Sequence, residues 1–251
     1  MNNNLTELVY ILDMSGSMSH LTDDTINGYN RLLEEQRKQN RENPNLKANV
    51  TTVFFDDRYI MIHDRENLDN VKDITTADYC PTGMTAMLDA VGRTVVSVGQ
   101  KLTATPEEER PGLVSVTIIT DGQENYSKEY NWAQIHEMIK EQREKYSWLF
   151  SFIGANIDVE VTAEQLGIAK GMSATYSCTA DSLNTVYDSI TVAATNARNA
   201  VATTGSVATA AGYYSDALNK ISTESYKAYA TCESPIFTTL TGNTITIGGN
   251  D

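Results

Sequence analysis

Several features that would place the chain in a common class of protein are missing from its 251 residues. The longest apolar runs, such as residues 8–12, are far shorter than the ~18 residues that a membrane-spanning helix needs. The N-terminus, MNNNLTE, lacks the basic region and apolar stretch of a secretory signal, so we expect a cytoplasmic protein. The three cysteines are widely separated and form no CxxC pair, which argues against a disulfide framework and a zinc site.

Basic charge is also scarce. The chain has 19 lysines and arginines against 33 aspartates and glutamates, which gives a net charge of −14. Such a surface repels phosphate backbones and anionic lipid, so we expect neither nucleic-acid nor membrane binding. The sequence contains no GxxxxGK phosphate loop and no GxSxG nucleophile elbow.

What is present is an alternation of strand-like and helix-like segments over the first 200 residues. This pattern predicts an α/β fold, a doubly wound, mostly parallel sheet flanked by helices. The expected strands are residues 8–12, 47–55, 59–63, 113–120, 149–153 and 173–178, with 47–55 and 59–63 forming an antiparallel edge hairpin. The spacing of apolar residues predicts helices near 22–33, 88–102, 132–139, 161–167 and 181–194.

The composition changes near residue 200, where alanine, threonine, serine and glycine become dominant. We therefore divide the chain into a domain of residues 1–200 and a C-terminal extension of residues 201–251. Two interpretations of the extension stay open. One is a helix over 213–229 followed by a hairpin of 237–240 and 244–247; the other is a loosely ordered tail.

Two predicted strands end on an aspartate, Asp13 in one case and Asp121 in the other. Ligands of open parallel sheets bind in the crevice outside the carboxyl ends of the strands. Since adjacent strands lie ~4.8 Å apart, the two carboxylates can point into one small site, where a cation would relieve their repulsion. Ser15 and Ser17 alternate with Met14 and Gly16 in the turn that follows Asp13. Hydroxyl and carboxylate oxygens suit Mg²⁺, Mn²⁺ or Ca²⁺ rather than zinc.

The motif residues of this site resemble those of a known family. Residues 13–17, DMSGS, are similar to the DxSxS motif of von Willebrand factor A domains and their metal-ion-dependent adhesion site. Residues 120–122 match the TDG element of that family, and residues 82–90, TGMTAMLDA, resemble its threonine loop. One departure is Met84, where a second glycine is common.

The resemblance implies that Ser15, Ser17 and Thr85 are direct metal ligands, with Asp13 and Asp121 binding directly or through water. Thr82 is the alternative to Thr85, which is preferred because the residues after it align with the family's loop. The resemblance also implies that the open metal position takes an Asp or Glu carboxylate from a partner protein. We therefore expect a metal-dependent binding module and no enzyme activity.

Two alternatives belong to other classes of function. A Mg²⁺-dependent phosphatase or phosphotransferase also places an aspartate after its first strand, but the haloacid-dehalogenase pattern requires a second aspartate where this chain has Ser15. A structural or assembly protein would use the metal only to fix its loops.

A further segment bears on the subgroup of the family. Segment 152–158, FIGANID, is similar to stand-alone bacterial or phage A-domain proteins of the tellurite-resistance-associated group.

Several polar and aromatic residues near the motifs carry weaker expectations. Glu124 and Asn125 are expected at the rim of the site, where they would touch a partner, and Tyr79 and Tyr126 as exposed contact anchors. His20 is expected to face solvent, His63 and His136 to be at the surface or half-buried and to form no ligand set, and Asp56 and Asp57 to be turn residues.

Overall fold

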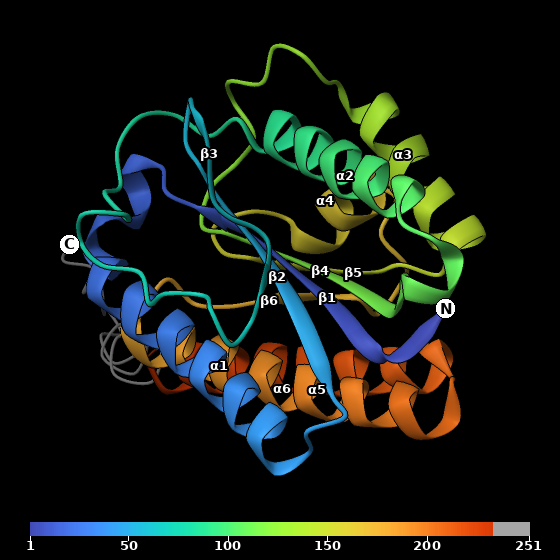
Figure 1. Cartoon of the computed structure of the whole chain (residues 1–251). Helices are drawn as coiled ribbons and strands as arrows, with labels where there is room; N and C mark the ends of the chain where they lie inside the picture. Colours follow the sequence, from blue (N-terminus) through green and yellow to red (C-terminus); the bar gives the residue numbers. More distant parts are fainter. Residues whose placement is uncertain (233–251) are drawn as a thin grey trace, which may run out of the picture.

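The structure of the protein is a computed structural model that describes residues 1–232, and Figure 1 shows it as three layers with a central sheet. Within these residues the sheet has six strands in the order β3-β2-β1-β4-β5-β6. All neighbouring strands are parallel except β2 and β3, which are antiparallel. The strands are β1 (Asn2–Asp13), β2 (Lys47–Phe55), β3 (Tyr59–Asn67), β4 (Pro111–Thr120), β5 (Leu149–Gly154) and β6 (Ser173–Thr175). The predicted mostly parallel α/β fold with one antiparallel pair is confirmed.

Helices cover both faces of the sheet, as the doubly wound pattern requires (Figure 1). On one face lie α1 (Thr22–Glu42), α5 (Ala180–Thr204) and α6 (Val207–Cys232); on the other lie α2 (Met87–Ala104), α3 (Trp132–Tyr146) and α4 (Val159–Gln165). Two short 3₁₀ helices, η1 (Gly16–Leu21) and η2 (Glu107–Glu109), complete the elements of the described chain. None of the helices in residues 1–232 combines the length and the apolar character needed to cross a membrane.

The central strands are buried on both faces, because helices lie above and below them. All ten residues of β4 are buried. β1 begins at Asn2, six residues before the predicted start, although residues 2–7 are mostly polar. Glu7 is fully buried there, and Arg65 of β3 donates to its carboxylate at 2.9 Å. The sequence pattern missed this part of the strand because the partner that stabilises Glu7 lies 58 residues away along the chain.

The last two helices, α5 and α6, pack against each other. Gly205, with φ of +68°, ends α5 and turns the chain into α6. The helix predicted to begin at Tyr213 begins at Val207, because the alanine-rich residues before Tyr213 are good helix formers and pack on α5. α5 continues past residue 200, and the division of the chain at that point stays a prediction. The hairpin expected at 237–240 and 244–247 lies outside the described residues.

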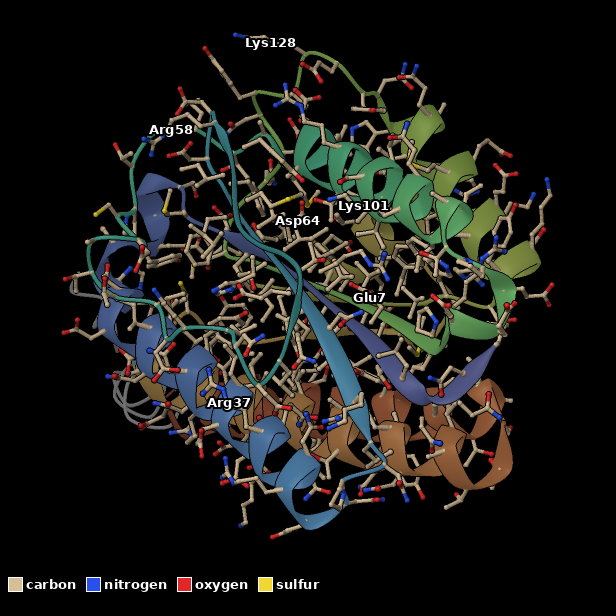
Figure 2. All side chains as sticks on the ribbon, viewed as in Figure 1. Glu7, Arg37, Arg58, Asp64, Lys101 and Lys128 are labelled. Atoms are coloured by element: carbon tan, nitrogen blue, oxygen red, sulfur yellow. The ribbon has the colours of Figure 1, made fainter. Side chains whose placement is uncertain are left out.

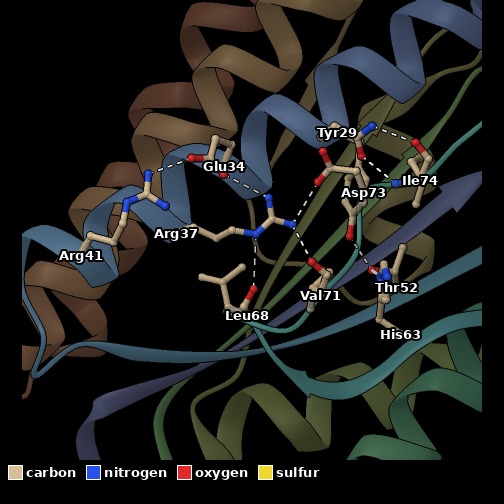
Figure 3. Close-up of polar contacts among 11 residues, drawn as sticks. Tyr29, Glu34, Arg37, Arg41, Thr52, His63, Leu68, Val71, Asp73 and Ile74 are labelled. Carbon is tan, nitrogen blue, oxygen red and sulfur yellow. Dashed lines mark hydrogen bonds and ion pairs between the residues drawn. The ribbon is translucent and has the colours of Figure 1, made fainter.

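The segment after β3 is held against α1 before it reaches the loop that contains Thr85. Figure 3 shows Arg37 of α1 donating to the backbone carbonyls of Leu68 and Val71, at 3.4 and 2.8 Å, and to Asp73 at 3.1 Å. Asn30 adds a reciprocal pair of hydrogen bonds with the backbone of Ile74, with both bonds 2.9 Å long. These contacts fix the start of the loop that later carries Thr85.

The point where the winding of the sheet reverses lies between β1 and β4. The chain leaves β1 toward β2 on one side and leaves β4 toward β5 on the other. The register pairs Leu12 with Ile119, so the strands end side by side. Their carboxyl ends therefore form the crevice in which α/β proteins bind ligands.

Candidate metal centre

The turn after β1 brings two hydroxyl groups to one point. The buried carboxylate of Asp13 accepts a hydrogen bond from the Ser15 backbone N–H at 2.6 Å, which tightens the turn. η1 begins directly after Ser15, and the Oγ atoms of Ser15 and Ser17 lie 3.1 Å apart. Two hydroxyl oxygens at this separation can contact one cation.

The aspartate after β4 faces the same point. The Ser17 hydroxyl donates to Asp121 Oδ1 at 2.5 Å, across 104 residues of sequence. The Thr120 hydroxyl donates to Asp13 Oδ2, also at 2.5 Å. Each of the two predicted carboxylates therefore accepts a hydrogen bond from a hydroxyl group of its own.

Thr85 completes the set of predicted residues. Its loop is held against the turn by bonds from Thr82 N to Met14 O and from Gly16 N to Gly83 O, 2.9 and 3.3 Å long. A Cβ atom placed on Gly122 would lie 3.6 Å from Thr85 Oγ1 and 3.7 Å from Ser17 Oγ, so both hydroxyls border this glycine. Thr85 is 4% exposed.

The geometry favours Thr85 over Thr82, since the Thr82 residue is exposed. Gly83 is the loop position that needs a glycine, because its φ is +69°. Met84 is not among the described non-glycine residues with positive φ. The departure from the family pattern at Met84 therefore leaves the loop backbone unstrained.

Glu124 and Asn125 have a positional role that the sequence did not reveal. Asn125 Oδ1 accepts from the Thr85 backbone N–H at 2.8 Å, and the Asn125 N–H donates to Thr85 O at 3.0 Å. The Glu124 carboxylate accepts from the N–H of Leu88, at the start of α2, and from the N–H groups of Tyr126 and Ser127, at 2.8–2.9 Å. The two residues clamp the Thr85 loop to the Asp121 loop.

Cys178 and His20 also border the site, and the sequence analysis did not select Cys178. The Cys178 thiol donates to Asp121 Oδ2 at 3.4 Å and lies 3.5 Å from His20 Nε2. Burial and the neighbouring Asp121 raise the pKa of Cys178 to about 12. No motif surrounds Cys178, and only the fold brings it to Asp121. His20 is exposed, as expected, and its Nδ1 donates to Ser17 O at 2.8 Å.

Other expectations are corrected by burial. Tyr79 is fully buried rather than exposed, and its hydroxyl donates to Asp13 O at 2.6 Å, below the site. His63 is 5% exposed, and its Nδ1 lies 2.9 Å from the Thr52 hydroxyl (Figure 3). Tyr126 is 36% exposed, in agreement with the expectation for it.

Asp56 is a turn residue, as expected. Its buried carboxylate accepts from the Arg58 backbone and guanidinium, and Figure 2 shows Arg58 beside the turn between β2 and β3. This pairing leaves Asp56 unsuited to a second metal.

The electrostatics of the site fit a hard cation. Asp13 and Asp121 are 1% and 2% exposed, and neither forms an ion pair with a described basic side chain. Burial raises the pKa of Asp13 to about 6; the charge of Asp121 also raises it, and hydrogen bonds from Thr120 and Ser15 lower it. No group of three His, Cys, Asp or Glu side chains suited to a metal occurs in the described chain. A cation here would therefore take serine and threonine oxygens in addition to the two carboxylates.

Comparison with known proteins gives matches among solved structures alone. No family model matches the sequence, and no curated protein matches it. Proximal thread matrix protein 1 from the mussel byssus aligns with a TM-score of 0.51 at 15% identity over 76% of this chain and 46% of its own. The PilB minor pilin from Streptococcus sanguinis gives 0.53 at 14% identity over 76% and 61%.

A third solved structure is that of a von Willebrand factor type A protein. The von Willebrand factor type A protein from Catenulispora acidiphila aligns with a TM-score of 0.50 at 16% identity, over 76% of this chain and 42% of its own. The chain thus spans between 42% and 61% of the lengths of these three proteins. At such low identity the likeness extends to the fold, and this chain has the von Willebrand factor A fold.

Proposed function

We propose that the chain is a divalent-metal-dependent protein-binding module. The observation that carries the proposal is the convergence of two buried carboxylates and three hydroxyls with no basic partner in the described chain. The residues that would hold the ion are Asp13, Ser15, Ser17, Thr85 and Asp121. One structure of proximal thread matrix protein 1 has zinc in its metal-ion-dependent adhesion site (MIDAS motif). That structure supports a divalent ion at the equivalent place in this fold.

Mg²⁺ is the ion that we propose first, with Mn²⁺ and Ca²⁺ as alternatives. All five proposed ligands supply oxygen, and Mg²⁺ needs six oxygen ligands and retains waters where protein ligands are few. Ser17 and the adjoining Gly16 are exposed residues, so this side of the site is accessible to solvent and to a partner. A bound ion would supply the positive charge that the two carboxylates lack.

The proposed partner is a protein that presents an Asp or Glu carboxylate to the open metal position. Neutral hydroxyl ligands leave the charge of the ion only partly neutralised, so an incoming carboxylate gains a strong electrostatic bond. At the exposed rim, Lys128 lies 4.0 Å from the centre of the Tyr126 ring and adds a cationic and aromatic contact surface. Without the ion, a chain with a net charge of −14 would repel an acidic partner.

The finer placement, among stand-alone cytoplasmic A-domain proteins of bacteria or phages, is also a proposal. It is supported by segment 152–158, in which Asn156 donates from Nδ2 to Asp121 O at 3.1 Å. Asp158 then caps α4, accepting from Val161 N at 3.1 Å. This segment thus supports the backbone of a proposed ligand.

Calorimetric titration with Mg²⁺ and Mn²⁺ tests the proposed site. Wild type should bind one ion, and binding should be lost in Asp13→Ala and in the double variant Ser15→Ala/Ser17→Ala. Ser19→Ala, an exposed serine of the same 3₁₀ helix, is the matched control and should bind as wild type does. Equal binding by all variants would refute the assignment of the ligands.

Pull-down from a lysate, with Mg²⁺ or with a chelator, tests the partner. Captured proteins should be released by the chelator and absent with Asp13→Ala. Hydrolysis of p-nitrophenyl phosphate tests the phosphatase alternative: Mg²⁺-dependent turnover that Asp13→Ala abolishes would replace the binding function with catalysis.

A further inference from the structure

A cavity opens at the end of the sheet opposite the metal centre. Its volume is about 940 Å³, and it lies between α2, the last turns of α3 and the first residues of β4. Figure 1 shows this end of the molecule, where the N-terminus lies beside the end of α2. β1 runs from here to Asp13 over 12 residues, which separates the cavity from the metal centre by roughly 35 Å.

Apolar side chains from several elements form the walls of this cavity. They include Leu102, Val114, Met138, Trp148 and Val207. Val96 and Tyr146 also line it, and they are 36% and 55% exposed, so the cavity presents apolar surface to water. Cavities of about 300–1,000 Å³ with mainly apolar walls are typical of sites for small molecules. An apolar ligand would cover these walls, which water cannot do favourably.

Gly99 keeps the α2 side of the cavity unfilled. It lines the cavity from the interior of the helix, and a Cβ atom placed on it would meet no atom within 4 Å. Its φ is not positive, so the backbone does not require a glycine here. A larger side chain at this position would therefore occupy the cavity without straining the helix.

Arg110 lies at the cavity with part of its guanidinium already fixed. Its Nε donates to Thr105 O at 2.8 Å and its Nη2 donates to Thr103 O at 3.1 Å, so the end of α2 holds one side of the group. The other end, formed by Nη1 and the second N–H of Nη2, is the fork that suits the two oxygens of a carboxylate. Arg110 forms no ion pair with a residue in the part of the chain that the structure describes.

The other charges of the lining do not oppose an anion beside Arg110. Lys145 and Glu141 pair with each other at 2.7 Å. Glu107 is exposed, so water and salt screen its charge, whereas Arg110 is half-buried. Water alone could solvate the guanidinium, but it would leave the apolar walls uncovered. The fixed cation and the apolar walls together favour a ligand that is both anionic and apolar.

We propose that this cavity binds a small monocarboxylate with an apolar chain, of the fatty-acid class. The carboxylate contacts the free end of the Arg110 guanidinium, and the chain covers the apolar walls as far as Trp148. The register pairs Ser115 with Leu149, so Val114 and Trp148, one residue earlier on each side, are neighbours in the wall. The proposal does not depend on the proposed metal function.

Quenching of tryptophan fluorescence by 11-bromoundecanoate tests the proposal, because bromine quenches an indole only at close approach. The chain has two tryptophans, so the full chain with Trp132→Phe reports on Trp148 alone. In a chelator, and below the concentration at which the probe forms micelles, this parent protein should be quenched. Gly99→Leu should abolish the quenching and keep or raise the melting temperature, since leucine forms helix better than glycine does.

Gly212→Leu is the matched control, since Gly212 is an exposed glycine of α6 with open space around it and does not line the cavity. It should bind the probe as the parent does. Quenching that is absent from the parent, or equal in Gly99→Leu, would overturn the proposal.

The alcohol 11-bromoundecanol separates the role of Arg110 from that of the apolar walls. Arg110→Gln should weaken binding of the carboxylate by about tenfold and leave binding of the alcohol unchanged, because only the carboxylate gains a charge-assisted bond. An unchanged affinity for the carboxylate, or an equal loss of both probes, would refute the assignment of the carboxylate to Arg110.

Discussion

Replacing Asp13 by asparagine should make the metal-free protein more stable while abolishing metal binding. The carboxyl group of Asp13 has its pKa raised from 3.8 to about 6, mainly by burial. The folded state therefore holds the proton more tightly than the unfolded state does. The stability that this group contributes is fully present below pH 3.8 and is lost as the pH rises through about 6.

The size of the effect follows from the two pKa values. The difference between 3.8 and about 6 corresponds to about 3 kcal/mol at neutral pH, or about 6–12 °C in melting temperature for a chain of this length. An amide in place of the carboxylate avoids this cost and keeps its contacts. Its oxygen can still accept from Ser15 N–H, and its NH₂ group can donate to Thr120 Oγ1. The Thr120 hydroxyl then donates to Gly122 O, which lies 3.2 Å away.

The assay is thermal unfolding followed by circular dichroism in a chelator, from pH 4 to pH 7.5. Asp13→Asn should melt higher than wild type at pH 7.5, and the difference should shrink as the pH falls toward 4. Added Mg²⁺ or Mn²⁺ should raise the melting temperature of wild type alone. A variant less stable than wild type at pH 7.5, or a difference that does not vary with pH, would refute the reasoning.

Three further predictions concern residues around and below the site. Glu124→Ala should weaken metal binding by about 10–100-fold in calorimetry, because the Thr85 loop loses its clamp to the Asp121 loop. An unchanged metal affinity would show that Glu124 does not position the ligands. Burial lowers the pKa of His63, so the free energy of unfolding should fall as the pH drops below 6.5. His63→Asn should reduce this dependence of the unfolding free energy on pH, measured by urea titration in the Asp13→Asn background. Gly28→Ala would place a Cβ 2.3 Å from Tyr187 and should cost about 1–3 kcal/mol of unfolding free energy. Gly99→Ala, also within a helix but with open space around it, should instead be neutral or stabilising by up to about 1 kcal/mol.

Much of the fold was predictable because its strongest signals are local. The apolar run before Asp13 and the one before Asp121 mark central strands, and both aspartates follow from the same pattern. The helix over 88–102 was predictable from the spacing of its apolar residues, and the structure buries the face of α2 that these residues form. The residues that the structure brings together at the candidate site were predictable because they lie within three short motifs.

What the sequence did not reveal depends on contacts between distant segments. Cys178 reaches Asp121 across 57 residues, and Glu7 is buried in β1 because Arg65 approaches from β3. Residue type alone predicts exposure for such polar groups, and only the folded chain supplies their partners. Glu124 and Tyr79 were placed at the surface for the same reason, although both bond to the backbone of the site loops.

The position of β4 in the sheet has a consequence for synthesis on the ribosome. β1 pairs with β2 on one side and with β4 on the other, and β4 begins 98 residues after β1 ends. While that stretch is being translated, β1 can pair with β2 but keeps one hydrogen-bonding edge open, next to apolar side chains. Unpaired edges of this kind promote aggregation of nascent chains. We therefore expect the growing polypeptide to be most dependent on chaperones before residue 120 has left the exit tunnel, and translation arrested there should give the least soluble product.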